Sequence, residues 1–254
     1  MIKPLILKFL HQIGFTLLSN DRYDKLRKLE NYKPSEDILA EHLRRLFALH
    51  EVECVFDVGA NDGTYVEWLR REVGFKGHVF SFEPIPKQIH VLEQKAAHDP
   101  LWTICPYALG RSEETREFHL MESDVFSSFL RPDPSQPGKY AESNLVSQSI
   151  PVRVSTVASA WHEISARHGL KSIYLKMDTQ GFDLEVFAGA QPVLGSIIAL
   201  QSELAFRKIY ANSPDYREAF DVFTSAKFRL SMLNPISFDE EKCMIEADAV
   251  YLRG

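Results

Sequence analysis

Short apolar segments alternate with longer amphipathic segments along residues 34–254, and this pattern predicts a layered α/β fold. Residues 54–58 form an apolar run around one aspartate, which is typical of a strand buried on both faces of a parallel sheet. Residues 78–82 repeat the pattern after a helical segment, so strands and helices alternate as they do in βαβ units. The predicted strands are 54–58, 78–82, 102–107, 117–121, 152–157, 173–177, 197–202, 228–233 and 247–252. The predicted helices are 65–73, 86–97, 161–168, 184–190 and 216–226, with a further helix that begins near Ser35.

The alternation is interrupted between residues 113 and 157. Residues 123–150 are rich in Ser, Pro, Gly and Asn and are predicted to form a long loop, and loops of that length are usually functional or disordered. The other strands make a core sheet of about seven, and the last two are predicted to close it as a hairpin. Right-handed crossovers place the carboxyl ends of the parallel strands, with their loops, at one edge of this sheet.

Residues 1–33 are predicted to form an amphipathic helix and a charged connector. The apolar residues recur at helical spacing, and they are Ile2, Ile6, Phe9, Ile13 and Leu17. Polar residues interrupt the segment, whereas a membrane span needs about 20 mostly uncharged residues. We expect the helix to pack on the domain or on a second subunit, and contact with a membrane surface or a partner is the alternative. The expected organisation is therefore this segment at 1–33 and one large domain at 34–254, with an insertion at about 113–157.

Composition and charge narrow the class of protein. The 254-residue chain has 29 Lys and Arg against 35 Asp and Glu, a formal charge of −6, so we expect no nucleic-acid partner. Its 45% hydrophobic and 25% charged residues are typical of a globular protein, which excludes the disordered and fibrous classes. The cysteines Cys54, Cys105 and Cys243 are too scattered for a disulfide framework or a zinc site, so we expect a reducing, cytoplasmic compartment.

The loop after the first predicted strand carries the strongest candidate chemistry. Asp57 lies near the end of that strand, and Gly59 and Gly63 allow the backbone to turn sharply and to approach a ligand closely. The helix that follows offers free N–H groups to an anion. Glu83 ends the next strand, where an acid can accept both hydroxyls of a ribose. Together these residues predict a pocket for an adenosine-containing ligand, although the glycines alone are equally compatible with a plain turn.

The glycine spacing favours S-adenosylmethionine over a dinucleotide. The dinucleotide fingerprint is G-x-G-x-x-G, and Asn61 stands here in place of its second glycine. A pyrophosphate needs that close backbone approach, whereas an amino-acid tail needs less of it. The same tail carries an ammonium group that Asp57 would help to hold.

Several motifs, in order along the chain, resemble those of the FkbM family of S-adenosylmethionine-dependent methyltransferases. They are VFDVGANDG at 55–63, FSFEP at 80–84, YALG at 107–110, SSF at 127–129, LKMDTQGFDLEVFAGA at 175–190, QSEL at 201–204 and DAVY at 248–251. The motif at 175–190 is the most distinctive one. One position departs from the family pattern, because Val157-Ala158 stands where the family has a Leu-Asp pair. The first 50 residues lie outside the resemblance.

The resemblance implies a class I methyltransferase (Rossmann-like) fold, with a seven-stranded mixed sheet, helices on both faces and an antiparallel last strand. It also implies O-methylation of a hydroxyl on a saccharide or related small-molecule metabolite. The cofactor-binding residues that it implies are Asp57, Gly59, Asn61, Gly63, Glu83 and Ala108.

Acidic residues at the ends of later strands are the candidate catalytic groups. A hydroxyl is a weak nucleophile, so a base within hydrogen-bond reach is needed, and Asp178 is the first candidate and Glu203 the second. Lys176 is expected to form an ion pair with one of them. No metal is required to activate a sulfonium methyl group, although Asp178, Gln180 and Glu203 offer oxygen ligands of the kind that Mg²⁺ prefers.

Other residues are weaker candidates for the acceptor side, and the sequence leaves two alternative functions open. The weaker candidates are His119, Phe126, Phe129, Tyr140, Arg207, Tyr210 and Asn212. Their aromatic members are equally suited to pinning the loop on the core. The alternatives to a methyltransferase are a non-catalytic nucleoside-binding or scaffolding module of the same fold and an NAD-dependent oxidoreductase.

Overall fold

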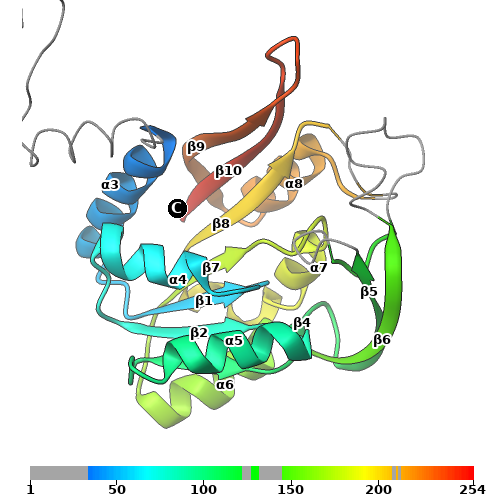
Figure 1. Ribbon diagram of the computed structural model, residues 1–254. Helices are drawn as coiled ribbons and strands as arrows, with labels where there is room; N and C mark the ends of the chain where they lie inside the picture. Colours follow the sequence, from blue (N-terminus) through cyan, green and yellow to red (C-terminus); the bar gives the residue numbers. More distant parts are fainter. Residues whose placement is uncertain (1–33, 122–126, 132–144, 208–209, 211–212) are drawn as a thin grey trace, which may run out of the picture. The chain divides into compact units, whose positions relative to one another are not determined.

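The computed structural model describes residues 34–121, 127–131, 145–207, 210 and 213–254 (Figure 1). The chain divides into two units, Met1–Asp37 and Ile38–Gly254. The helix predicted within residues 1–33 lies outside the described residues, so that prediction stays open. The description below concerns the second unit.

A seven-stranded sheet with the order β3-β2-β1-β7-β8-β10-β9 forms the centre of this unit. Neighbouring strands are parallel from β3 to β8, while β10 is antiparallel to both β8 and β9. The prediction of a mixed sheet with an antiparallel last strand is therefore confirmed, as is the closing hairpin. The strands are β1 (Cys54–Val58), β2 (His78–Phe82), β3 (Trp102–Cys105), β7 (Ile173–Met177), β8 (Ile197–Ala205), β9 (Phe228–Phe238) and β10 (Met244–Arg253).

Helices cover both faces of this sheet, as predicted. Alternate residues of β1 point to opposite faces, so Val55 belongs to one hydrophobic cluster and Phe56 to the other. The Val55 face packs on α3 (Pro34–Leu49), α4 (Thr64–Trp68), the π-helical turn Leu69–Val73 and α5 (Pro86–Ala96). The Phe56 face packs on α6 (Val157–His168), α7 (Asp183–Ala188), the 3₁₀ turn Gln191–Ser196 and α8 (Tyr216–Ser225).

The insertion between β3 and α6 forms a second sheet of its own, which lies at one end of the main sheet in Figure 1. Its order is β4-β6-β5, with β4 (Ala108–Leu109) parallel to β6 (Val146–Ser155) and β5 (Glu114–Met121) antiparallel to β6. The predicted loop at 123–150 was therefore too long, because residues 146–150 pair with β5 as part of β6. These residues are mostly exposed, so they lack the apolar pattern that marks a buried strand.

The start of α6 corrects a second prediction. Val157 was predicted to end a strand, but it is the first residue of α6. Thr156 is the N-cap, and its hydroxyl accepts a hydrogen bond from the Ser159 N–H at 3.0 Å. A threonine cap of this kind satisfies the free N–H groups of the first turn. Thr156 thus caps the helix directly before Val157-Ala158, the pair that departs from the family pattern.

Candidate active site

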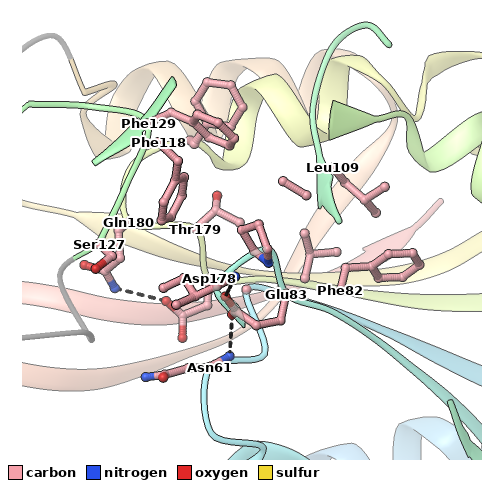
Figure 2. Close-up of a pocket in the computed structure, with 16 residues that line it drawn as sticks. Asn61, Phe82, Glu83, Leu109, Phe118, Ser127, Phe129, Asp178, Thr179 and Gln180 are labelled. Atoms are coloured by element: carbon pink, nitrogen blue, oxygen red, sulfur yellow. Dashed lines mark hydrogen bonds between the residues drawn. The ribbon is translucent and has the colours of Figure 1, made fainter. Parts of the chain in front are cut away.

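A cavity of about 180 Å³ opens at the carboxyl ends of β1, β2 and β7, where the sequence predicts a ligand site. The main sheet supplies one wall, and the insertion supplies another through Phe118, Ser127 and Phe129 (Figure 2). The lining residues are Val58, Gly59, Asn61, Phe82, Glu83, Pro84, Ile85, Ala108, Leu109, Phe118, Ser127, Phe129, Asp178, Thr179, Gln180 and Phe182. Of the predicted cofactor residues, Gly59, Asn61, Glu83 and Ala108 therefore line the cavity, whereas Asp57 and Gly63 do not.

Glu83 is buried in the cavity wall, where the main chain holds its carboxylate. One oxygen accepts a hydrogen bond from the Asn61 N–H at 2.9 Å, and the other accepts one from the Ile85 N–H at 2.8 Å. Burial raises the pKa of Glu83 to about 7, and the bonds from Ile85 and Asn61 offset part of that effect. Because each carboxylate oxygen can accept two hydrogen bonds, both oxygens keep acceptor capacity for a ligand.

The two glycines of the first loop are required by packing inside the protein. A Cβ on Gly59, which has φ +76°, would lie 2.0 Å from the carbonyl oxygen of Asp178. This glycine therefore lets the ends of β1 and β7 come together at the cavity. A Cβ on Gly63 would lie within 3 Å of Leu92 and Trp102, and Gly63 is the left-handed N-cap of α4. Direct contact of Gly63 with a ligand stays a prediction.

Asp57 is completely buried beneath the cavity and is paired with a cation of the protein itself. Its Oδ1 lies 2.9 Å from Lys176 Nζ, and its Oδ2 accepts a hydrogen bond from Ser81 Oγ at 3.1 Å. Burial acts to lower the pKa of Lys176, but the charges of Asp57 and Asp178 outweigh it and raise that pKa. The predicted role of Asp57 toward a ligand ammonium stays a prediction, and in the structure its Oδ1 is paired with the Lys176 ammonium.

This ion pair belongs to a row of polar side chains that crosses the buried sheet. Ser81, Asp57, Lys176 and Gln201 occupy paired positions on four neighbouring strands, so their side chains share one face. Gln201 Nε2 donates to Asp248 Oδ1 at 2.9 Å, which extends the row to β10. The partner predicted for Lys176 was Asp178 or Glu203. The structure gives Asp57 as its nearest partner and places Asp178 at 3.6 Å.

Asp178 follows β7 and reaches into the cavity with 43% of its side chain exposed. Lys176 lies on the side of its Oδ2, and Gln180 Nε2 donates to its Oδ1 at 3.1 Å (Figure 2). The predicted catalytic acid therefore faces the same cavity as Glu83, and it is held by two side chains. An exposed carboxylate with a fixed orientation is suited to accept a proton from a bound hydroxyl group.

Glu203, the second catalytic candidate, lies next to this cavity and not in its lining. It borders a smaller cavity on the other side of Gln180, together with Tyr210 and Glu246. Burial, and then the charge of Asp178, raise the pKa of Glu203 well above its usual value. Burial likewise raises the pKa of Glu246, and it raises that of Asp248 to about 6. This concentration of buried acids disfavours the ionised form of each of them.

Asp183 at the start of α7 ties the loop after β7 to β8. Its Oδ1 accepts hydrogen bonds from the N–H and the hydroxyl of Thr179, at 2.9 and 2.5 Å. Its Oδ2 accepts one from Ser202 Oγ at 2.7 Å. Burial raises the pKa of Asp183, and the bonds from Thr179 and Ser202 counteract this. These bonds fix the position of Thr179, which lies between Asp178 and Gln180 in the loop after β7.

The insertion contributes an aromatic wall that sequence reasoning found only in part. The ring of Phe129 packs edge-on against that of Phe118, with 4.9 Å between the ring centroids, and its centroid lies 4.7 Å from that of Phe182. Phe129 therefore both packs in the core and lines the cavity. Ser128 Oγ donates to the Gln180 carbonyl oxygen at 3.0 Å, which fastens the insertion to the loop after β7. Phe118 and Phe182 were not predicted, since their alternation with polar neighbours shows burial and not what they face. Phe126, Tyr140 and Asn212 lie outside the described residues.

The remaining acceptor-side candidates make other contacts. His119 is absent from the cavity lining and pairs through Nδ1 with Ser149 Oγ at 2.8 Å. Tyr210 donates to Gln180, while Arg207 lies 4.0 Å from Asp239.

The predicted magnesium ligands receive no support from the geometry. Within the described ranges, no three His, Cys, Asp or Glu side chains are arranged to hold a metal ion. In the same part of the chain, no helix has both the length and the apolar character to cross a membrane.

The strand order, the antiparallel β10 and the cavity at the carboxyl ends of β1, β2 and β7 define a class I methyltransferase fold. The sequence matches the model of the methyltransferase FkbM domain over residues 57–230, which is more than half of the chain. The chain therefore belongs to the FkbM methyltransferase family. No curated protein matches the sequence.

Solved structures with a similar arrangement are distant in sequence. A methyltransferase FkbM from Methylobacillus flagellatus KT is 13% identical, with a TM-score of 0.49, over 79% of this chain and 43% of that one. Fibrillarin from Aeropyrum pernix, solved with bound S-adenosyl-L-methionine, is 10% identical with a TM-score of 0.43, over 79% and 66%. Magnesium protoporphyrin IX methyltransferase from Synechocystis PCC 6803, also solved with bound S-adenosylmethionine, is 10% identical with a TM-score of 0.45, over 99% and 97%.

These similarities do not decide function. The chain spans less than half the length of the FkbM structure, and none of the three TM-scores reaches 0.5. The fold assignment therefore depends on the strand order, and the family assignment depends on the sequence match.

Proposed function

We propose that the protein is an S-adenosylmethionine-dependent O-methyltransferase that acts on a hydroxyl of a saccharide or related small metabolite. The observation that carries the proposal is that one cavity has Glu83 and Asp178 in its lining. Glu83 suits the ribose of the cofactor, and Asp178 suits the hydroxyl that is methylated. We also propose a cytoplasmic location, a catalytic domain at 34–254 and an accessory segment at 1–33.

The residues in the cavity fit the nucleoside part of the cofactor. Glu83 keeps acceptor capacity on both oxygens, which matches two neighbouring ribose hydroxyls. Phe82, Ile85 and Leu109 supply an apolar surface for an adenine ring. The methionine end is assigned to the turn at Gly59 and Asn61. Asp57 supports this turn from below, because the Lys176 that it holds also donates to the Gly59 carbonyl oxygen at 3.4 Å.

When bound, S-adenosylmethionine supplies a sulfonium methyl group that passes to a nucleophile in line with the sulfur. The chain has to hold the acceptor hydroxyl in that line, and positioning of this kind can contribute roughly 7–11 kcal/mol. Asp178 accepts the hydroxyl proton as the oxygen attacks. Phe118, Phe129 and Phe182 form an apolar wall that excludes water and offers ring surfaces to a sugar. The acidic net charge disfavours nucleic acid as the acceptor.

Calorimetric titration with S-adenosylhomocysteine, the demethylated product, tests the cofactor site. We expect the wild-type protein to bind it and Glu83→Ala to weaken binding by about tenfold or more, as loss of hydrogen bonds to charged groups does. Glu93→Ala is the matched control, because Glu93 is exposed on α5. Binding of NADH but not of S-adenosylhomocysteine would favour the oxidoreductase instead.

Turnover separates an enzyme from a non-catalytic module of the same fold. Transfer of tritiated methyl from S-adenosylmethionine to a panel of methyl glycosides would be measured for wild type and Asp178→Asn. We expect Asp178→Asn to retain S-adenosylhomocysteine binding and to lose turnover. Full activity in Asp178→Asn would exclude it as the base. Binding without transfer to any acceptor would favour the scaffolding module.

A further inference from the structure

Gln180 makes more polar contacts with the acceptor side of the site than its position in a loop would suggest. Its Nε2 donates to Asp178 Oδ1 at 3.1 Å and lies 3.4 Å from Glu203 Oε2. Its Oε1 accepts a hydrogen bond from the Tyr210 hydroxyl at 2.7 Å. Since the amide nitrogen has two hydrogens, it can serve both carboxylates while the oxygen is engaged elsewhere. With its oxygen engaged by Tyr210, the amide directs its nitrogen at the two acids, and the reverse orientation would place the amide oxygen against carboxylate oxygens.

The main chain of Gln180 adds a second, independent observation. Its φ is +54°, a left-handed conformation that costs a non-glycine residue about 1 kcal/mol or more. Ser128 Oγ donates to its carbonyl oxygen and helps to hold this conformation. Gly181, which follows at φ +87°, continues the turn. A strained residue that the surrounding structure holds in place, beside the cavity, is typical of a functional site.

We propose that Gln180 is a positioning residue, which holds the carboxylates of Asp178 and Glu203 side by side and keeps Asp178 oriented toward the acceptor hydroxyl. This inference rests on the proposed function, since it assigns Gln180 a part in the same reaction. Gln180 lines the main cavity together with Asp178 and the smaller cavity together with Glu203, so its amide reaches both acids. Figure 2 shows its side chain directed at Asp178.

A neutral amide at this point is surrounded by charged and titratable groups. Those that face it or its two partners are Lys176, Asp178, Asp183, Glu203, Tyr210, Glu246 and Asp248. Five of these are carboxyl groups, one is a neutral phenol and one is an ammonium, so a further negative charge here would be repelled by the carboxylates around it. An amide donates to carboxylates without adding such a charge, which explains the suitability of glutamine over glutamate.

The first test is Gln180→Leu, which keeps most of the side-chain volume and removes the amide. With the methyl glycoside that serves the wild type best, we expect kcat to fall by about 10- to 100-fold, as misplacement of a catalytic group by about 1 Å does. The Kd for S-adenosylhomocysteine should stay within about twofold of wild type, since Gln180 does not hold Glu83. Gln94→Leu is the matched control, because Gln94 is exposed on α5, and it should leave kcat unchanged.

The second test is Gln180→Glu, which distinguishes positioning from a merely structural role. A protonated carboxyl at this point has the shape of the amide and can donate to one of the two acids while it accepts from Tyr210, whereas an ionised one repels Asp178 and Glu203. We therefore expect the ratio of Gln180→Glu to wild-type kcat to rise roughly tenfold from about pH 8 to about pH 6. The Gln180→Leu ratio should change little over this range, because leucine does not titrate.

The outcomes separate this inference from the proposed function. A wild-type protein that binds no S-adenosylhomocysteine or transfers no methyl group would overturn both. An active wild type with normal kcat in Gln180→Leu would overturn the positioning role alone. A Gln180→Glu ratio that does not depend on pH would also overturn it. Low kcat with unchanged cofactor affinity, together with recovery of Gln180→Glu at low pH, supports it.

Discussion

The two acids that line the cavity are held in different ways. Glu83 is bound by main-chain N–H groups of Asn61 and Ile85, which belong to the loops after β1 and β2. Asp178 is bound by side chains, with Lys176 on one oxygen and Gln180 on the other. A main-chain contact persists as long as the local fold does, whereas a side-chain contact depends on each partner. The cofactor side of the site should therefore tolerate substitutions that disable the acceptor side.

Lys176→Met is the change with the largest expected effect on this difference. It removes the cation that neutralises the fully buried Asp57, and an uncompensated buried charge costs about 3–5 kcal/mol. It also removes one of the two supports of Asp178. Equilibrium unfolding in urea would measure the loss of stability. Turnover should fall further than S-adenosylhomocysteine affinity, measured on the fraction that stays folded, because the affinity is reduced only through the lost contact of Lys176 with the Gly59 carbonyl oxygen.

The double variant Lys176→Met with Asp57→Asn is the control for this cost. With both charges removed, Ser81 can still donate to the amide oxygen. We expect the double variant to regain a large part of the stability that Lys176→Met loses. It should not regain turnover, because Asp178 still lacks the Lys176 cation. No recovery of stability would mean that the lost packing of Lys176, and not the orphaned charge, explains the effect.

Gly59→Ala should affect both sides of the cavity together. The added methyl would meet the Asp178 carbonyl oxygen at 2.0 Å, so the ends of β1 and β7 must move apart. We expect a loss of at least about 2 kcal/mol in the free energy of unfolding. Gly74→Ala is the matched control, because Gly74 has φ +74° with nothing near its added Cβ, and it should lose only about 1 kcal/mol. Equal losses in the two variants would contradict the close approach.

A contrast between local patterns and distant contacts governs how far the sequence predicts the fold. β1, β2 and β7 coincide with their predicted bounds, because short apolar runs between turns are recognisable locally. β6 was recognised only at its end, since residues 146–150 are exposed and pair with β5 across a long intervening segment. An exposed strand of that kind is defined by its partner and not by its own composition.

The site was predictable to a similar degree. Glu83, Gly59 and Asp178 line one cavity, as their places in the sequence predict, because each ends or follows a buried strand and parallel strands bring such positions to one edge. Their roles toward a ligand stay predictions. The link between Lys176 and Asp57 was missed, because no local pattern shows which acid a buried lysine contacts. Their pairing follows from β1 lying beside β7 in register, which is a property of the whole sheet.

The raised pKa of Glu83 predicts that binding on the cofactor side of the site depends on pH. Burial raises this pKa to about 7. Only a small fraction of Glu83 is therefore ionised, and able to accept from two hydroxyls, at about pH 6, whereas most of it is ionised at about pH 8. We expect S-adenosylhomocysteine affinity to increase by about three- to tenfold between these pH values, measured by calorimetry. Glu83→Ala should show a flat dependence. A wild-type affinity that falls as pH rises would contradict the assignment of this carboxylate to the ribose.

Asp248→Asn gives the smallest expected effect and tests the acidic surroundings of Asp178. Burial raises the pKa of Asp248 to about 6 in the folded protein, against an ordinary value of 3.8. Because the raised pKa favours the protonated form, folding is penalised increasingly as pH rises through about 6. Wild type should therefore lose about 1 kcal/mol relative to Asp248→Asn between about pH 5 and pH 7.5, measured by urea unfolding.

Comparing the free energies of unfolding of wild type and Asp248→Asn at each pH cancels the contributions of the groups that titrate in both proteins. Glu83, Glu203 and Glu246 titrate in both, and Gln201 can still donate to the amide oxygen that replaces Asp248 Oδ1. A difference in stability that stays constant with pH would mean that Asp248 is ionised at little cost. The polar row would then already balance its charges through Lys176 and Gln201. In that case the acceptor side would be as well supported electrostatically as the cofactor side, and its sensitivity to substitution would have to come from orientation alone.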